Sequence, residues 1–258
     1  MAEEKSLSAQ KILIFAAGLA LGLVLGFILT NQLNRQELEK ARTAADPQTA
    51  PPPAQQPAGD PDSLPDLTDE QLREAVARAD AAPQDVSLQR TAGQALYLYA
   101  MSKGNPSILP DAARILRRAH EADPKDYNTA VIAGNANFLL ARSQNDPSRL
   151  AEARRFYEGA LADRPDDVAV RTSLGLTYFY ATPPDPRRAI REFRRALEAD
   201  PRSEMTLQSL AAALIEAGDF QEAERRLGEL ERVNGSNQEL PNLRARLEQM
   251  RNAAKERP

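Results

Sequence analysis

The sequence predicts an all-α fold made of repeated helical pairs, and two observations support this prediction. Almost the same phrase occurs three times, as LRRAHEADPKD (116–126), YEGALADRPDD (157–167) and FRRALEADPRS (193–203). In each copy a large residue is followed three places later by Ala and eight places later by Pro. Beyond residue 66, apolar residues recur with helical spacing, and no alternating β-type run occurs. A phrase that recurs indicates a structural unit that recurs.

The composition excludes several classes of function. The 258 residues include 33 basic and 37 acidic side chains, so a net charge of −4 does not suggest a nucleic-acid partner. There is no Cys, which excludes thiolate zinc sites and Cys nucleophiles. The single histidine, His120, is expected to be a solvated surface residue, and none of the common phosphate-loop or hydrolase motifs occurs. We therefore expect a non-enzymatic protein without a cofactor or metal.

The first element is a predicted membrane anchor. After a polar tail at 1–11, residues 12–29 form 18 consecutive apolar or Gly positions. As a helix this run would be ~27 Å long, close to the hydrocarbon thickness of a bilayer. No small-residue cleavage site of the kind that ends a signal peptide follows it. We expect a transmembrane helix over 12–30 that contacts the lipid bilayer.

Three glycines give this helix a distinctive face. Gly18, Gly22 and Gly26 are spaced as G-x-x-x-G-x-x-x-G, which allows a second helix to approach closely. This spacing is compatible with a homo-oligomer, but Gly is also common in membrane spans that do not associate. Two basic residues precede the span and three follow it, so the positive-inside rule does not decide its orientation.

Residues 31–66 are predicted to be a juxtamembrane segment and a linker. Seven prolines lie between 47 and 65, with hardly any large apolar residue among them. Such a segment cannot bury a core, and we expect an extended spacer. The alternative is a Pro-rich ligand for an aromatic-lined groove.

The remaining chain divides into a lead-in helix and four units. The lead-in helix is expected within 67–83, capped by Thr68 or Asp69. Pro124, Pro165 and Pro201 are 41 and 36 residues apart, and Gly235 follows 34 residues later. These intervals define units at about 86–124, 127–165, 168–201 and 204–236. The first two units have about seven extra residues between their helices, which we expect to form long loops at 102–111 and 143–150.

These units resemble tetratricopeptide repeats, which have a 34-residue period. The diagnostic residues of that family, in the third unit, are Leu174, Gly175, Tyr178, Ala189, Phe193, Ala196 and Pro201. The resemblance implies a right-handed α-solenoid of about four hairpins over 84–236, closed by a capping helix within 237–258. One departure is that the Trp typical of the family's fourth position is absent, and Arg171 stands there in the third unit.

The resemblance also implies a peptide-binding groove on the concave face of the array. In the family, four positions of each first helix line this face. The corresponding residues that we single out are Arg90, Gln94, Tyr97, Asn128, Asn135, Phe138, Thr172, Leu176, Phe179 and Gln208. For the aromatic side chains among them, packing between repeats is an equally good alternative to ligand binding. The Lys–Asn–Arg clamp with which chaperone-binding members hold a C-terminal carboxylate is not present.

Together these features predict a membrane-anchored scaffold that binds a protein or an extended peptide. In layout it resembles bacterial single-span proteins that display such repeats outside the inner membrane, which favours a periplasmic array and a role in assembling an envelope complex. One alternative is a structural spacer whose transmembrane helix self-associates. A further alternative is an apoprotein chaperone of the cytochrome c maturation type.

Overall fold

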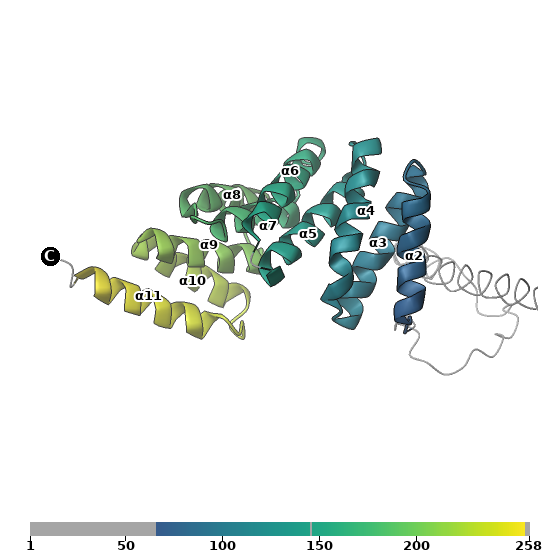
Figure 1. Ribbon diagram of the computed structural model, residues 1–258. Helices are drawn as coiled ribbons and strands as arrows, with labels where there is room; N and C mark the ends of the chain where they lie inside the picture. Colours follow the sequence, from purple (N-terminus) through teal and green to yellow (C-terminus); the bar gives the residue numbers. More distant parts are fainter. Residues whose placement is uncertain (1–65, 145, 256–258) are drawn as a thin grey trace, which may run out of the picture. The chain divides into compact units, whose positions relative to one another are not determined.

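The computed structural model describes residues 66–144 and 146–255, and all regular secondary structure in these ranges is helical (Figure 1). The elements are α2 (Asp69–Ala81), α3 (Val86–Lys103), the 3₁₀ helix η1 (Pro106–Ile108), α4 (Leu109–Ala122), α5 (Tyr127–Gln144), α6 (Pro147–Asp163), α7 (Val168–Phe179), α8 (Pro186–Ala199), α9 (Glu204–Ala217), α10 (Phe220–Val233) and α11 (Leu240–Lys255). The prediction of an all-α fold is confirmed for this part of the chain.

The predicted anchor, its three glycines and the Pro-rich linker lie outside the described residues. Within 66–144 and 146–255, no helix combines the length and the apolar character needed to cross a bilayer.

The described residues divide into two compact units, one ending at Ile115 and the other beginning at Leu116, within α4. In the N-terminal unit, the side chain of Gln89 on α3 is buried and donates hydrogen bonds to the carbonyls of Ala79 (2.5 Å) and Ala82 (3.0 Å) at the end of α2. The hydroxyl of Tyr99 donates to the Leu67 carbonyl and accepts from the Leu67 N–H, at 3.2 and 3.1 Å. These bonds fix α2 against α3.

One four-residue turn recurs at every junction between successive repeats, and it explains the repeated phrase. In each turn the N–H of the fourth residue donates to the carbonyl of the first, at 3.1–3.3 Å. The turns are 82–85, 123–126, 164–167, 200–203 and 234–237. Four have Pro in the second position and the fifth has Gly, as expected for tight turns. The first turn contains Pro83, which the sequence analysis did not align. Helix α2 is therefore the second helix of a partial unit, equivalent to α4, α6, α8 and α10.

The last residue of most of these turns also begins the next helix. The carboxylates of Asp85, Asp126 and Asp167 accept from the backbone N–H three residues later, at 2.9–3.1 Å. Asn237 does the same for α11, at 3.0 Å from the N–H of Leu240. Each cap pairs a helix-terminal N–H that would otherwise have no partner. The repeated phrase thus both ends one helix and starts the next.

The extra residues of the first two units do not form the long loops expected at 102–111 and 143–150. Instead they lengthen the first helices: α3 and α5 each have 18 residues, against 12 in α7 and 14 in α9. Helix α3 ends at Gly104, which has a left-handed backbone (φ 61°) and is followed almost at once by η1. The loop prediction was wrong because the first inserted residues continue the helix. In the first repeat the residue that ends the helix, Gly104, comes only after them.

Close approach of the two helices in a hairpin depends on glycine. A Cβ atom added at Gly134 would lie 2.6 Å from Cε1 of Tyr157, and one added at Gly175 would overlap the ring of Phe193. Tyr157 and Phe193 are fully buried, with 1% and 0% of their surface exposed. Each ring lies directly on the glycine of its own hairpin and also packs in a cluster with residues of the next hairpin, Tyr157 with Leu174 and Phe193 with Leu210.

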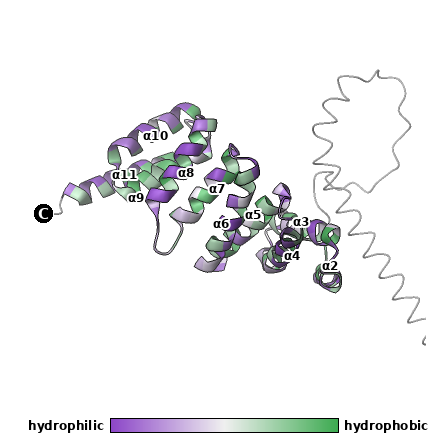
Figure 2. Cartoon of the chain, turned by 90° about the horizontal axis from the view of Figure 1, so that it is seen from above, coloured by the Kyte–Doolittle hydropathy of each residue, from purple (hydrophilic) through white to green (hydrophobic). Residues whose placement is uncertain are grey.

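Successive hairpins of the C-terminal unit are joined by apolar and polar contacts. Figure 2 shows hydrophilic and hydrophobic residues on every helix of this unit, as amphipathic packing requires. The buried carboxylate of Glu222 on α10 accepts from Arg194 on α8 and from Arg226, which lies 3.2 Å away. Burial disfavours the charged form of Glu222, but these two guanidinium groups outweigh it and hold its pKa below the ordinary value.

Helix α11 closes the C-terminal unit. Leu240, Leu243 and Leu247 are buried in the cluster that α9 and α10 form, and Met250 packs against the same cluster. The arginines between these positions remain exposed on the other face of the helix. This pattern is that of a capping helix, which covers the last repeat and presents a polar surface to solvent.

Candidate functional site

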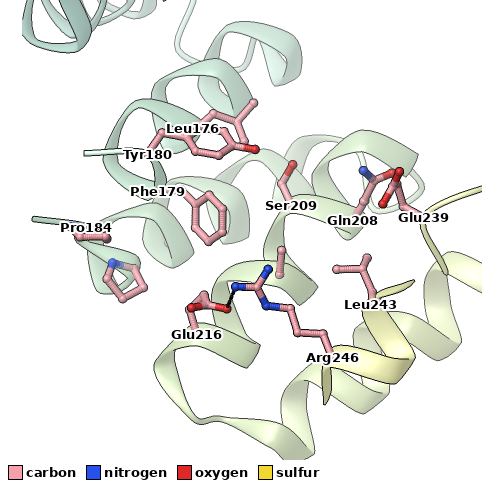
Figure 3. Close-up of a pocket in the computed structure, with 12 residues that line it drawn as sticks. Leu176, Phe179, Tyr180, Pro184, Gln208, Ser209, Glu216, Glu239, Leu243 and Arg246 are labelled. Atoms are coloured by element: carbon pink, nitrogen blue, oxygen red, sulfur yellow. Dashed lines mark ion pairs between the residues drawn. The ribbon is translucent and has the colours of Figure 1, made fainter. Parts of the chain in front are cut away.

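A pocket of about 620 Å³ lies on the face of the C-terminal unit formed by α7, α9 and α11 (Figure 3). Its residues come from the end of α7, the segment before α8, the exposed side of α9 and the first turns of α11. Helices α7 and α9 are the first helices of their pairs, and α11 follows the last pair, so the pocket follows from the order in which these elements stack.

One wall of the pocket is aromatic and apolar. Phe179 ends α7, and its ring meets that of the next residue, Tyr180, edge to face with centroids 5.1 Å apart. Leu176 and Pro184 extend this wall. The N–H of Asp185 donates to the carbonyl of Tyr178 at 3.0 Å and folds the connecting segment back onto α7. This fold places the short Pro-rich insertion of the third unit at the rim of the pocket.

The aromatic wall continues toward α5. The ring of Phe138 lies 6.1 Å from that of Tyr180, and the guanidinium carbon of Arg142 lies 3.8 Å from the centroid of the Tyr180 ring. Aromatic pairs and cation–π contacts of this kind each contribute about 0.5–1.5 kcal/mol. They hold Tyr180 in place although 37% of its surface is exposed.

The floor of the pocket is polar. Gln208 and Ser209 lie on α9, and Ala212 follows one turn later. The Oε1 atom of Gln208 accepts a hydrogen bond from Asn237 at 3.1 Å, which fixes the amide. Neither Nε2 of Gln208 nor the Ser209 hydroxyl has a hydrogen-bond partner among the described residues. The floor therefore offers two donors that can bind the carbonyl groups of an extended backbone.

The opposite wall belongs to α11 and carries charge. The guanidinium of Arg246 reaches across to the end of α9 and forms an ion pair with Glu216 at 2.6 Å, shown by the dashed line in Figure 3. Glu239 lies at the rim, where its carboxylate accepts only from Asn242 within the described residues, and Leu243 presents apolar surface between the charged groups. The pocket lining thus has two carboxylates and one guanidinium.

Three of the ten predicted groove residues, Leu176, Phe179 and Gln208, line this pocket. Phe138 contacts it indirectly, through Tyr180. Asn135 lies away from it, and its amide oxygen accepts from the Tyr157 hydroxyl at 2.8 Å. Sequence reasoning missed much of the pocket, because these residues lie outside the family positions that it used. The missed residues are Tyr180, Pro184, Pro186, Ser209, Glu216, Glu239, Leu243 and Arg246.

The other predicted residues lie elsewhere. Thr172 is 1% exposed and does not face a groove; its hydroxyl is 2.7 Å from that of Thr206, between α7 and α9. Asn128 is exposed at the start of α5. Arg90, Gln94 and Tyr97 are partly buried on α3 in the N-terminal unit, so they are not part of the site described here.

His120 is not the solvated residue that we expected. It is half-buried, its ring packs edge-on against Phe156 with centroids 5.1 Å apart, and its Nδ1 is buried without a hydrogen-bond partner. Burial lowers the pKa of His120, against the opposing effect of Asp126 and its neighbours. The described residues contain no group of His, Asp and Glu arranged to bind a metal.

Comparison with known proteins identifies the repeat. A sequence model described as tetratricopeptide repeat matches residues 185–247, which include most of the pocket. This part of the chain is similar to the tetratricopeptide repeat. The match begins at the cap of α8 and ends within α11, so it covers the part of the array in which the repeat period is closest to 34 residues.

Solved structures share the tetratricopeptide fold. The structure titled "Crystal structure of YrrB: a TPR protein with an unusual peptide-binding site" is 14% identical, with a TM-score of 0.54 over 68% of this chain and 84% of that one. Two crystal structures of MamA are 21% identical, with TM-scores of 0.51 and 0.52 over 65% of this chain and 88% and 82% of theirs. No curated protein matches the chain. At these identities the comparisons establish the fold, an α-solenoid of tetratricopeptide repeats.

Proposed function

We propose that the protein is a non-enzymatic scaffold that binds a segment of a partner protein in the pocket between α7, α9 and α11. The observation that carries this proposal is the combination of an aromatic wall with two donors on the floor, Gln208 Nε2 and the Ser209 hydroxyl, which have no partner among the described residues. An extended peptide needs both, because its carbonyls must be bonded when they leave water and its apolar side chains need surface to cover.

The size of the pocket is consistent with this ligand. A volume of about 620 Å³ is in the range of sites that hold a small ligand or a few side chains. The related fold of YrrB, whose title names a peptide-binding site, supports the use of such an array for peptides.

Site-specific photo-crosslinking tests the proposal. A photo-reactive amino acid replaces Glu239 at the rim of the pocket, and in a separate variant it replaces Gln221, an exposed residue of α10 that does not line the pocket. We expect a discrete adduct in cells from position 239 and none from 221. The adduct should disappear when Ser209→Tyr fills the pocket, and persist with the matched control Gln221→Tyr. An adduct at 239 that survives Ser209→Tyr contradicts the proposal.

Phe179→Ala provides a quantitative check on the aromatic wall. Partly buried aromatic residues at binding sites typically contribute 2 kcal/mol or more, so we expect about a 30-fold loss of affinity for the crosslinked partner. Far-ultraviolet circular dichroism should show that the helical content is unchanged. An affinity within about twofold of the unsubstituted protein would show that the aromatic wall does not contact the partner.

We further propose that residues 12–30 anchor this scaffold in a bacterial inner membrane with the repeats on the periplasmic side, where it assists assembly of an envelope complex. The 18-residue apolar run supports the anchor. Because the chain has no cysteine, Ala58→Cys in the linker provides a unique label. An impermeant maleimide should label it in intact cells, whereas labelling only after lysis would place the repeats in the cytoplasm.

A further inference from the structure

The charged wall of the pocket indicates the charge of the ligand side chain that would fit there. We propose that the pocket selects a peptide with a basic residue, Arg or Lys, next to an apolar or aromatic one. This inference rests on the proposed function, and it adds the charge class of the ligand at the same site.

The pocket already holds a guanidinium group of the protein itself. Arg246 extends from α11 into the pocket and pairs with Glu216 at 2.6 Å, so Glu216 forms a subsite for a cation (Figure 3). The Arg246 side chain is 57% exposed. It can therefore leave Glu216 and remain solvated, which makes its replacement by a cation from a ligand inexpensive.

The two possible charges of a ligand side chain have different consequences for this ion pair. A basic ligand residue that replaces Arg246 keeps Glu216 paired and gains attraction from Glu239, which has no cationic partner among the described residues. An acidic ligand residue would instead have to take Arg246 from Glu216, leaving two carboxylates facing it. Because like charges in a partly desolvated groove repel, the acidic ligand is disfavoured.

The charges beyond the lining lead to the same conclusion. Glu204 accepts from Asn234 and Asn237 at 2.8 and 2.6 Å, behind Gln208, and it has no ion-pair partner among the described residues. Arg142 is stacked on Tyr180, which belongs to the aromatic wall. The end of the pocket near α11 is therefore acidic. The stem of a Lys or Arg side chain entering there would lie along Phe179 and Leu243.

A random peptide library displayed on phage and selected against the full chain tests the inference. We expect peptides with Arg or Lys beside an apolar residue to be enriched, relative to selection against Ser209→Tyr. An enriched peptide is then resynthesised with Gln or Glu in place of its basic residue, and binding is measured by fluorescence anisotropy. We expect about a fivefold loss for Gln and a larger loss for Glu.

Two substitutions in the protein make the result specific. Glu216→Gln should remove the preference for the basic peptide over its Gln version. Arg246→Gln should strengthen binding of the basic peptide about twofold or more, because it removes the internal competitor. The matched control is Arg251→Gln, which breaks the similar α11 ion pair with Glu224 (2.7 Å) outside the pocket. This control should leave affinity unchanged.

The outcomes separate this inference from the proposed function. Enrichment of acidic peptides, or weaker binding after Arg246→Gln, would overturn the charge preference. Enrichment of neutral peptides that Ser209→Tyr abolishes would likewise refute it while leaving the pocket as a peptide site. No enrichment over Ser209→Tyr would refute both.

Discussion

Gly175→Ala is the sharpest test of how the hairpins are held together. Replacing Gly by Ala inside a helix normally stabilises a protein by about 0.5–1 kcal/mol, because Ala loses less conformational entropy. At Gly175 the new methyl group would overlap the ring of Phe193, which is 0% exposed. Overpacking of this kind costs about 1–3 kcal/mol. We therefore expect a net loss of about 1–2 kcal/mol, opposite in sign to the usual effect.

The matched control is Gly159→Ala, in the interior of α6. An added Cβ there would meet no atom within 4 Å, so only the helix propensity changes and we expect a gain of about 0.5–1 kcal/mol. Urea unfolding followed by far-ultraviolet circular dichroism gives both free energies. For a protein of this size, the two variants should differ by several degrees in Tm.

A double-mutant cycle identifies the cause. Phe193→Leu removes the ring edge that the methyl group would overlap, so Gly175→Ala should cost less in that background. We expect a coupling of about 1 kcal/mol or more between the two substitutions. If Gly175→Ala stabilises the protein as much as Gly159→Ala does, or if the cycle shows no coupling, close contact between α7 and α8 does not depend on the glycine.

Two further predictions concern pH. Glu222→Gln should cost about 1–3 kcal/mol near neutral pH, because Arg194 and Arg226 lose a charged acceptor. The folded-state pKa of Glu222 is depressed, so its contribution to the free energy of unfolding is complete above its unfolded pKa of about 4.5 and is lost as pH falls. Urea unfolding should therefore show the stabilities of the two proteins converging in acid. A difference in stability that stays constant with pH would contradict the assignment. His120 also has a depressed pKa, through burial against Phe156. The unfolded state therefore binds a proton at His120 more readily than the folded state. The unsubstituted protein should lose stability relative to His120→Gln as pH falls below about 6.5. If the free energies of unfolding of the two proteins instead change in parallel down to about pH 5, His120 is solvated.

Much of the fold could be predicted because each junction between units has a local signal. Pro124, Pro165 and Pro201 occupy the same position of the same turn, and the residue two places later begins the next helix. Such signals require no knowledge of tertiary structure. The turn at Pro83 carries the same signal, but its repeat phrase is incomplete, so the sequence predicts only a lead-in helix before the first repeat.

Other features depended on contacts that no local pattern shows. Arg171 stands where the family has Trp, and the structure explains the exchange. Its guanidinium pairs with Glu192 on α8 at 2.8 Å and donates to the Pro165 carbonyl at the end of α6. Thr172 was misassigned for a related reason, since a residue predicted to line a groove can be buried when the next repeat packs on it.

The composition of the pocket follows from where the array ends. Within the C-terminal unit, α5 contacts α7 and α7 contacts α9, and Thr172 shows how such a contact buries polar groups. Beyond α9 the covering element is α11, which has no second helix after it among the described residues. Helix α11 buries its leucines against α9 and α10, as a helix of a further repeat would. Its exposed side carries Arg246, and its N-terminal cap, Asn237, donates a hydrogen bond to Gln208. Residues on this side do not have to satisfy the repeat pattern, so they can be selected for a ligand. For the same reason the family positions predicted the aromatic wall and floor of the pocket in part, but none of its charged wall.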